Sequence, residues 1–161
     1  MALHTIEVNS EITSLTQVLE WLGAVCGDRL GASDFQQLEI IIAEAFTNTV
    51  KYAHAKLSAS TPILLDLLLD SHQVEVRIWD RGEPFDLSTH LQAELGEIDV
   101  EQSLRQDGHR GLLLMKRLSD DLFYETIHDH QNCLVMRKKI SNPQCSSRWI
   151  NDFDGIAVAV C

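Results

Sequence analysis

Two glycines frame the start of a predicted helix, in the stretch Gly108-His-Arg-Gly111. Residues 112–118 follow with apolar side chains at helical spacing. The first N–H groups of a helix have no partner within the helix, and the helix dipole favours anions there. A glycine-rich helix start can therefore cradle a phosphate group. Two glycines alone are a weak signal, so other residues must support this interpretation.

A carboxylate at the end of a predicted strand is the second candidate for chemistry. Val74, Val76 and Ile78 alternate with polar or larger residues, which predicts a strand with one buried face. Asp80 shares their parity and points toward the core if the strand extends that far. A carboxylate in that position is costly unless a partner satisfies it. Alternatively, Asp80 already belongs to the turn Asp-Arg-Gly82 and faces water.

A polar face on a long predicted helix is the third candidate. The helix is expected from residue 33 to about residue 55, and Ser33 with Gln36 has the form of a capping box. Glu44, Asn48 and Lys51 lie on one face, because residues three and four apart are neighbours. By itself, such a face is most simply a solvated surface. The apolar stripe of the same helix consists of Leu38, Ile41, Ile42, Ala45, Thr49 and Tyr52.

The elements that position these residues follow from periodicity. Strands are predicted at residues 4–8, 63–69, 74–79, 122–127 and 133–140, and further helices at 12–26 and 112–118. Residues 87–107 are polar and aperiodic, which is typical of a loop that is either functional or disordered. We expect one domain over residues 1–140 and a C-terminal tail of unknown role over residues 141–161.

Composition narrows the classes of function. The net charge of −11 disfavours nucleic acid and anionic membranes as partners, and favours basic protein surfaces. No apolar run reaches the roughly 20 residues of a membrane helix, and residues 1–10 lack a signal-peptide pattern. The four cysteines form no C-x-x-C pair, so free thiols in the cytoplasm are expected and a zinc site is not. His128 and His130 are two residues apart, as two metal ligands on one face of a strand could be. No third ligand is evident, so ordinary surface histidines are expected.

The three candidates occur in a characteristic order along the chain. Glu44-Ala-Phe-Thr-Asn48 lies on a helix, Asp80-Arg-Gly82-Glu-Pro-Phe85-Asp86 ends a strand, and Gly108-His-Arg-Gly111-Leu112 opens a helix after a long loop. This set resembles the three nucleotide-binding boxes of the GHKL (Bergerat-fold) ATPases, and within them the anti-sigma-factor serine/threonine kinases. The resemblance covers roughly residues 5–140, and the three boxes together are specific.

The resemblance implies a fold and a function. The expected fold is α+β, a two-layer sandwich whose mixed, mostly antiparallel sheet carries its helices on one face. The expected function is an ATP-dependent serine/threonine kinase that binds and inhibits a sigma factor. Its substrate would be a STAS-type anti-sigma-factor antagonist, its cofactors ATP and Mg²⁺, and its location the cytoplasm. A homodimer is left open.

The resemblance also assigns roles in the first two boxes. It implies that Glu44 is the general base for the attacking serine hydroxyl. Asn48 would supply an oxygen ligand to Mg²⁺ and contact the nucleotide. Lys51 would reach a phosphate. Asp80 would accept a hydrogen bond from the exocyclic amine of adenine, and Gly82 would let the ring approach the backbone.

The remaining implied contacts lie near the long loop. Phe85 would shape the pocket wall, or alternatively serve as a core aromatic residue. Residues 86–106 would form a lid over ATP, with Arg105 as a weaker candidate contact. Gly108 and Gly111 would hinge this lid. The phosphates would face Arg110, Gly111 and Leu112, with a charge-assisted contact from Arg110.

Two departures from the family pattern keep alternatives open. His109 stands where a glycine is common, which would stiffen the phosphate loop. Many relatives place a threonine in the last strands beside the adenine carboxylate, whereas the nearest positions here are Cys133 and Leu134. The alternatives are a nucleotide-binding switch module without kinase activity, a stand-alone histidine-kinase catalytic domain, and an unrelated α/β domain.

Overall fold

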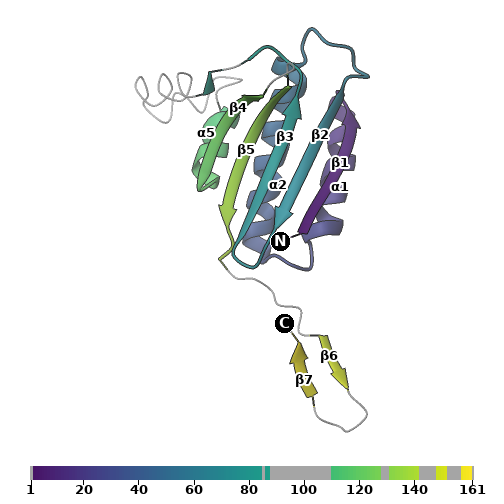
Figure 1. The fold of residues 1–161 in the computed structure, drawn as a ribbon, viewed down its shortest axis with the longest axis vertical. Helices are drawn as coiled ribbons and strands as arrows, with labels where there is room; N and C mark the ends of the chain where they lie inside the picture. Colours follow the sequence, from purple (N-terminus) through teal and green to yellow (C-terminus); the bar gives the residue numbers. More distant parts are fainter. Residues whose placement is uncertain are drawn as a thin grey trace.

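Antiparallel strands with helices on one face make up the main body of the chain (Figure 1). The computed structural model describes residues 2–84, 86–87, 110–127, 131–141, 148–151 and 157–160. The spatial order of the five strands is β1-β2-β3-β5-β4, and all four pairings are antiparallel. Their bounds are β1 Ala2–Asn9, β2 Pro62–Leu69, β3 Gln73–Asp80, β4 Asp121–Ile127 and β5 Gln131–Lys139.

The helices form the second layer, behind the sheet in Figure 1. They are α1 (Leu15–Cys26), which follows a short 3-10 turn at Ile12–Ser14, α2 (Ala32–Asn48), which continues into a π-helical turn at Thr49–Ala53, and α5 (Arg110–Leu118). This arrangement confirms the expected α+β sandwich with helices on one face of the sheet. The described sheet is antiparallel throughout, whereas a mixed, mostly antiparallel sheet was expected.

The core lies between the two layers and is almost entirely aliphatic. Its largest fully buried side chains come from α1 and α2 on one side and from β2 and β3 on the other: Leu22, Leu38, Ile41, Ile42, Phe46, Ile63, Leu65, Leu67 and Ile78. Each fully buried residue of this kind contributes about 1.5–3 kcal/mol of transfer free energy. Packing of α2 against the sheet therefore fixes the position of every polar group that α2 carries.

The side chains of β3 alternate between the two faces of the sheet as the sequence predicts. Val74, Val76 and Ile78 are at most 2% exposed, and the strand extends to Asp80, whose side chain is 3% exposed. The inward orientation of Asp80 is thus confirmed, and the alternative of a solvent-facing carboxylate in the turn is wrong.

The start of α2 differs from the sequence prediction. The helix begins at Ala32 with Gly31 as its N-cap residue, and no side chain caps it. Ser33 lies inside the first turn, where its Oγ accepts a hydrogen bond from Gln37 Nε2 (3.2 Å). The capping box of Ser33 and Gln36 is therefore wrong, because the extended backbone of Gly31 starts the helix two residues earlier than a Ser33 cap requires.

The end of α2 also differs. After Asn48 the backbone widens into the π-helical turn, shown by the hydrogen bond from the His54 N–H to the Thr49 carbonyl (2.8 Å). The wider turn shifts the angular position of every later side chain. Tyr52, predicted to lie on the apolar stripe, is 58% exposed for this reason.

The opposite face of the sheet carries its own polar network. Glu75 is 4% exposed and forms ion pairs with Arg77 and Arg137, each at 2.6 Å. Burial alone would raise the pKa of Glu75, but the hydrogen bonds from Arg137 and Arg77 lower it below its ordinary value. The Arg137 guanidinium also stacks over the Phe123 ring (5.1 Å). These contacts occupy the polar groups in the middle of this face.

The C-terminal segment contains a second, two-stranded sheet made of β6 (Arg148–Asn151) and β7 (Ala157–Val160). Before it, Ser141 contacts the start of α2. Its N–H and hydroxyl donate to the buried Asp34 carboxylate at 2.8 and 3.3 Å. The boundary proposed at residue 140 stays a prediction. As for membrane spans, the helices in the described ranges are all too short or too polar to cross a bilayer.

We predict that the domain needs Ser141 but nothing after residue 142. A chain ending at Asn142 should keep its free energy of unfolding within about 0.5 kcal/mol, because it retains both donors of Ser141 to the Asp34 carboxylate. A chain ending at Ile140 should lose about 1–3 kcal/mol, because Asp34 is left buried without its donors. Urea denaturation of both chains measures this. Equal stabilities would show that Ser141 does not anchor the domain.

Candidate functional site

The polar face of α2 meets the start of α5. Glu44 and Asn48 lie one turn apart, are half-buried, and form no hydrogen bond to any described residue. Gly111, in the first turn of α5, lies directly over them. A Cβ on Gly111 would overlap the Glu44 carboxylate and come within 3.4 Å of Asn48 Nδ2. The first and third boxes of the sequence are therefore adjacent in space.

The first turn of α5 supplies backbone groups to this junction. Arg110 is its first residue, and Gly111 and Leu112 follow. The Leu112 side chain is 8% exposed and belongs to the core, so only its backbone remains for a ligand. The N–H groups of this turn have no partner within the helix, which makes them available to an anion. Lys51 is exposed on the π-helical turn and makes no hydrogen bond or ion pair within the described ranges.

Asp80 lies at the other end of the site and is held by three donors. Its Oδ1 accepts from the Gly82 N–H (2.8 Å) and from Asn132 Nδ2 (3.0 Å), and its Oδ2 accepts from the Tyr124 hydroxyl (2.9 Å). Burial, followed by the charge of Asp80, raises the pKa of Tyr124 far above its ordinary value, so the phenol stays protonated and donates. The carboxylate is thus fixed in orientation.

Asn132 and Tyr124 are the functional neighbours that the sequence interpretation missed. The sequence places Cys133 and Leu134 nearest to the position where many relatives have a threonine beside the adenine carboxylate. The register instead places Asn132 opposite Asp80, and Cys133 lies opposite Trp79, on the other face of the sheet. Asn132 is 1% exposed, and its Oδ1 has no hydrogen-bond partner in the described structure. Parity along β5 was the available signal, because Asn132 alternates with the inward residues Leu134 and Met136.

Gly82 packs against the end of the α2 segment. A Cβ at this position would overlap the backbone carbonyl of Ala53, and the Gly82 carbonyl accepts from Asn132 Nδ2 (2.9 Å). The glycine is therefore required by close backbone contact. Gly82, in the second box, therefore packs against Ala53, which follows the first box.

Several predicted site residues lie outside the described residues. These are Phe85, Arg105, Gly108, His109 and nearly all of the expected lid. His128 and His130 also lie outside the described residues. For Arg110 only the backbone is described. Leu87, at the expected start of the lid, is 6% exposed and belongs to the core.

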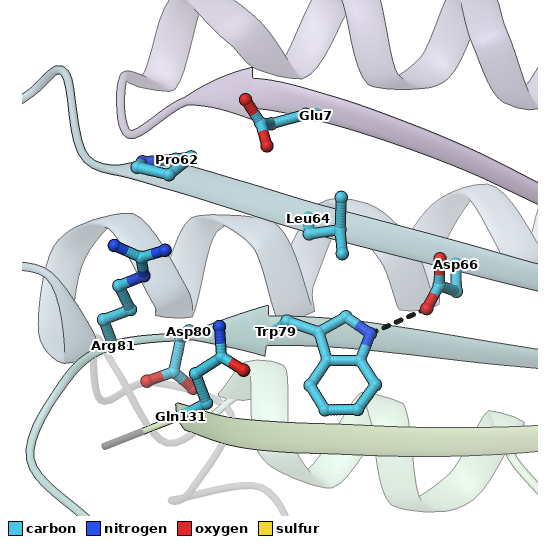
Figure 2. Close-up of a pocket in the computed structure, with 8 residues that line it drawn as sticks. All are labelled: Glu7, Pro62, Leu64, Asp66, Trp79, Asp80, Arg81 and Gln131. Atoms are coloured by element: carbon cyan, nitrogen blue, oxygen red, sulfur yellow. Dashed lines mark hydrogen bonds between the residues drawn. The ribbon is translucent and has the colours of Figure 1, made fainter. Parts of the chain in front are cut away.

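A cavity of about 250 Å³ lies elsewhere, on the sheet face opposite α2. Figure 2 shows its lining, in which the Trp79 indole donates to Asp66 (2.8 Å) and the Glu7 and Arg81 side chains lie near the rim. Asp80, at one end of the candidate site, also lines this cavity, whereas the junction of Glu44 with Gly111 lies on the helix side of the sheet.

The two described cysteines, Cys26 and Cys133, are buried free thiols. Burial raises the pKa of the Cys26 thiol to about 11 and that of the Cys133 thiol to about 12. Both thiols are therefore protonated near neutral pH and are poor nucleophiles.

The family model of the histidine kinase-like ATPase domain matches residues 8–138. The chain belongs to this family. Its curated relatives place it with the serine-protein kinases, and ATP is the nucleotide that this family uses. The serine-protein kinase RsbW of Listeria monocytogenes serovar 1/2a is 35% identical over 68% of each chain. RsbW of Bacillus mycoides is 29% identical over 69% of this chain and 68% of its own.

Among solved structures, the mycobacterial sensor histidine kinase MprB matches 86% of this chain and 99% of its own, with 13% identity and a TM-score of 0.49. This similarity is too distant to bear on function.

We predict that Gly82 cannot be replaced without loss of stability. Gly82→Ala should lower the free energy of unfolding by about 1–3 kcal/mol, because the backbone carbonyl of Ala53 cannot move away as a side chain would. Gly23→Ala is the matched control, since an added Cβ there meets nothing within 4 Å inside α1. It should stabilise the protein by about 0.5–1 kcal/mol. Thermal unfolding of both variants tests this, and a neutral Gly82→Ala would contradict the described packing.

Proposed function

We propose that the chain is an ATP-dependent protein serine/threonine kinase that acts as an anti-sigma factor. It would bind a sigma factor and phosphorylate a STAS-type antagonist of that interaction in the cytoplasm. The observation that carries the proposal is the junction of Glu44 and Asn48 with Gly111. Two half-buried polar side chains without partners among the described residues face a glycine at a helix start, at a place where any larger residue would collide.

The residues of this junction fit Mg-ATP. Asn48 offers an amide oxygen of the kind that Mg²⁺ accepts, with phosphates and waters supplying the remaining ligands. The backbone of Arg110, Gly111 and Leu112 would hold the phosphates, together with Gly108 and Lys51. When bound, Mg²⁺ would neutralise charge that develops on the transferred phosphoryl group.

The adenine ring of ATP would be recognised at the end of the site that contains Asp80. Three donors occupy three acceptor sites of the carboxylate, which leaves one on Oδ2. The exocyclic amine of adenine is a donor that fits it, whereas guanine presents an acceptor at the same place. Asn132 Oδ1, which has no donor in the described structure, is a second acceptor beside it. Gly82 and Phe85 would border the ring.

Glu44 would act as the general base. It takes the proton of the attacking serine hydroxyl while the new O–P bond forms and the bond between the β- and γ-phosphates breaks, releasing ADP. Its half-buried carboxylate has no ion-pair partner among the described residues, so it is available as an acceptor. A histidine acceptor would not need this base in the same way.

We predict that Asp80→Asn weakens ATP binding by about 1–3 kcal/mol, because a charged acceptor becomes a neutral amide that carries its own donor. Asp66→Asn makes the same change of charge on the opposite face of the sheet and should leave the affinity unchanged. Calorimetry with ATP and GTP measures both. If the wild type binds ATP and GTP equally, Asp80 does not select adenine.

We predict that Glu44→Gln separates binding from chemistry. Nucleotide affinity should stay within a few-fold, while phosphorylation of the antagonist should fall by about 10²–10⁴, the usual contribution of a positioned base. Glu39→Gln, on the same helix, should phosphorylate at the wild-type rate.

Intact mass and phosphosite mapping of a STAS partner provide the measurement. Unchanged phosphorylation by Glu44→Gln would remove Glu44 from its role as general base. Two outcomes would overturn the serine/threonine kinase proposal: phosphate on histidine, and ATP binding without transfer by the wild type. The last would favour a switch module.

A further inference from the structure

His54 connects three segments of the chain from a buried position. It follows the π-helical turn, is 3% exposed, and contacts neither Glu44 nor Asn48 through any hydrogen bond. Its Nε2 lies 3.0 Å from the Arg81 backbone nitrogen, and its Nδ1 lies 3.0 Å from Ser10 Oγ. The imidazole therefore links the end of the α2 segment to the end of β3 and to the residue after β1.

The backbone of Arg81 determines the tautomer of this ring. A backbone N–H can only donate, so Nε2 must be the unprotonated acceptor. In the neutral ring the proton is then on Nδ1, which donates to Ser10 Oγ. A second proton on Nε2 would face the Arg81 N–H and abolish that hydrogen bond.

The turn that His54 holds is the one that positions Asp80. Arg81 donates to the ring, and the next N–H, from Gly82, donates to Asp80 Oδ1 (2.8 Å). Gly82 also packs on the carbonyl of Ala53, the residue before His54. Two consecutive residues of the turn are thus fixed by two consecutive residues of the α2 segment.

We propose that His54 is a positioning residue for nucleotide binding: its neutral ring holds the Arg81–Gly82 turn in the conformation that aims Asp80 at the base. This inference rests on the proposed ATP site. It adds a residue outside the three boxes, which acts through Arg81 and does not touch the ligand.

The charges around the ring set the direction of its pH dependence. Burial lowers the pKa of His54 below its ordinary value of 6.5, Asp80 opposes this, and Arg81 adds to it. Ser10, on the other side, is neutral. The unfolded chain therefore takes up a proton at a higher pH than the folded chain. The stability that His54 contributes is complete above pH 6.5 and is lost as the pH falls below that value.

The test uses the full chain and four variants. His54→Gln can place an amide oxygen near the position of Nε2 and keeps an acceptor that does not titrate. His54→Phe removes both polar contacts, and Ser10→Ala removes only the Nδ1 partner. His72→Gln is the control, because His72 is exposed in the turn between β2 and β3. Mg-ATP affinity is measured by calorimetry from pH 7.5 downward through and below pH 6.5, because the pKa of folded His54 lies below that value.

At pH 7.5 we expect wild-type affinity for His54→Gln and for His72→Gln, and about three- to tenfold weaker binding for His54→Phe. As the pH falls, the wild type and His72→Gln should lose more affinity than His54→Gln. Titration of ATP itself is common to all and cancels in this comparison. Equal affinities for wild type and His54→Phe, or identical pH profiles for wild type and His54→Gln, would overturn the proposal.

A nucleotide-free measurement separates this inference from the proposed function. In NMR spectra the Arg81 amide should shift with the protonation of His54 in the wild type and not in His54→Gln, and Ser10→Ala should raise the Nε2–H tautomer population. If His54→Phe does not fold, the NMR measurements on Ser10→Ala and His54→Gln still test whether His54 holds the Arg81 amide. An Arg81 amide insensitive to pH would refute the His54 role even if ATP binds. A pH-linked Arg81 amide in a wild-type chain that binds no ATP would refute the ATP site and, with it, the positioning role.

Discussion

The buried carboxylate of Asp80 is the constraint on which this end of the molecule depends. Removing such a group from water costs several kcal/mol unless hydrogen bonds replace the lost hydration. Here the donors come from the following turn, from β4 and from β5. The carboxylate can be buried only when these three segments have already assembled around it. The sheet order β3-β5-β4 brings Tyr124 and Asn132 to Asp80, while close contact with the Ala53 carbonyl requires the glycine at position 82.

Periodicity predicted which way most of these side chains point. It could not predict which residues from other strands they contact, and the reason is physical. Alternation along β3 correctly oriented Asp80, and helical spacing correctly put Glu44 and Asn48 on one face. Tyr124 and Asn132 were missed because they are 44 and 52 residues from Asp80 in sequence. Periodicity tells which face a residue occupies, whereas the register between strands decides which residue it meets.

The error in the sequence prediction at the C-terminal end of α2 has a local cause. The spacing of apolar residues does not distinguish an α-helical turn from a π-helical one, so Tyr52 was assigned to the buried stripe. Asn48 faces α5, and Ala53 and His54, just over one turn later, face the end of β3. The α2 segment therefore contacts both the start of α5 and the turn that follows β3.

The two buried carboxylates of β3 show why only one of them suits a ligand. Glu75 and Asp80 are about equally buried, on opposite faces of the same strand. Glu75 is paired with two guanidinium groups, whose positive charges neutralise it. Asp80 has only neutral donors, so its negative charge is oriented but not neutralised. An exocyclic amine or another neutral donor can therefore still gain a charge-assisted hydrogen bond from Asp80. A ligand of Glu75 would gain less, because the negative charge of Glu75 already has two cationic partners.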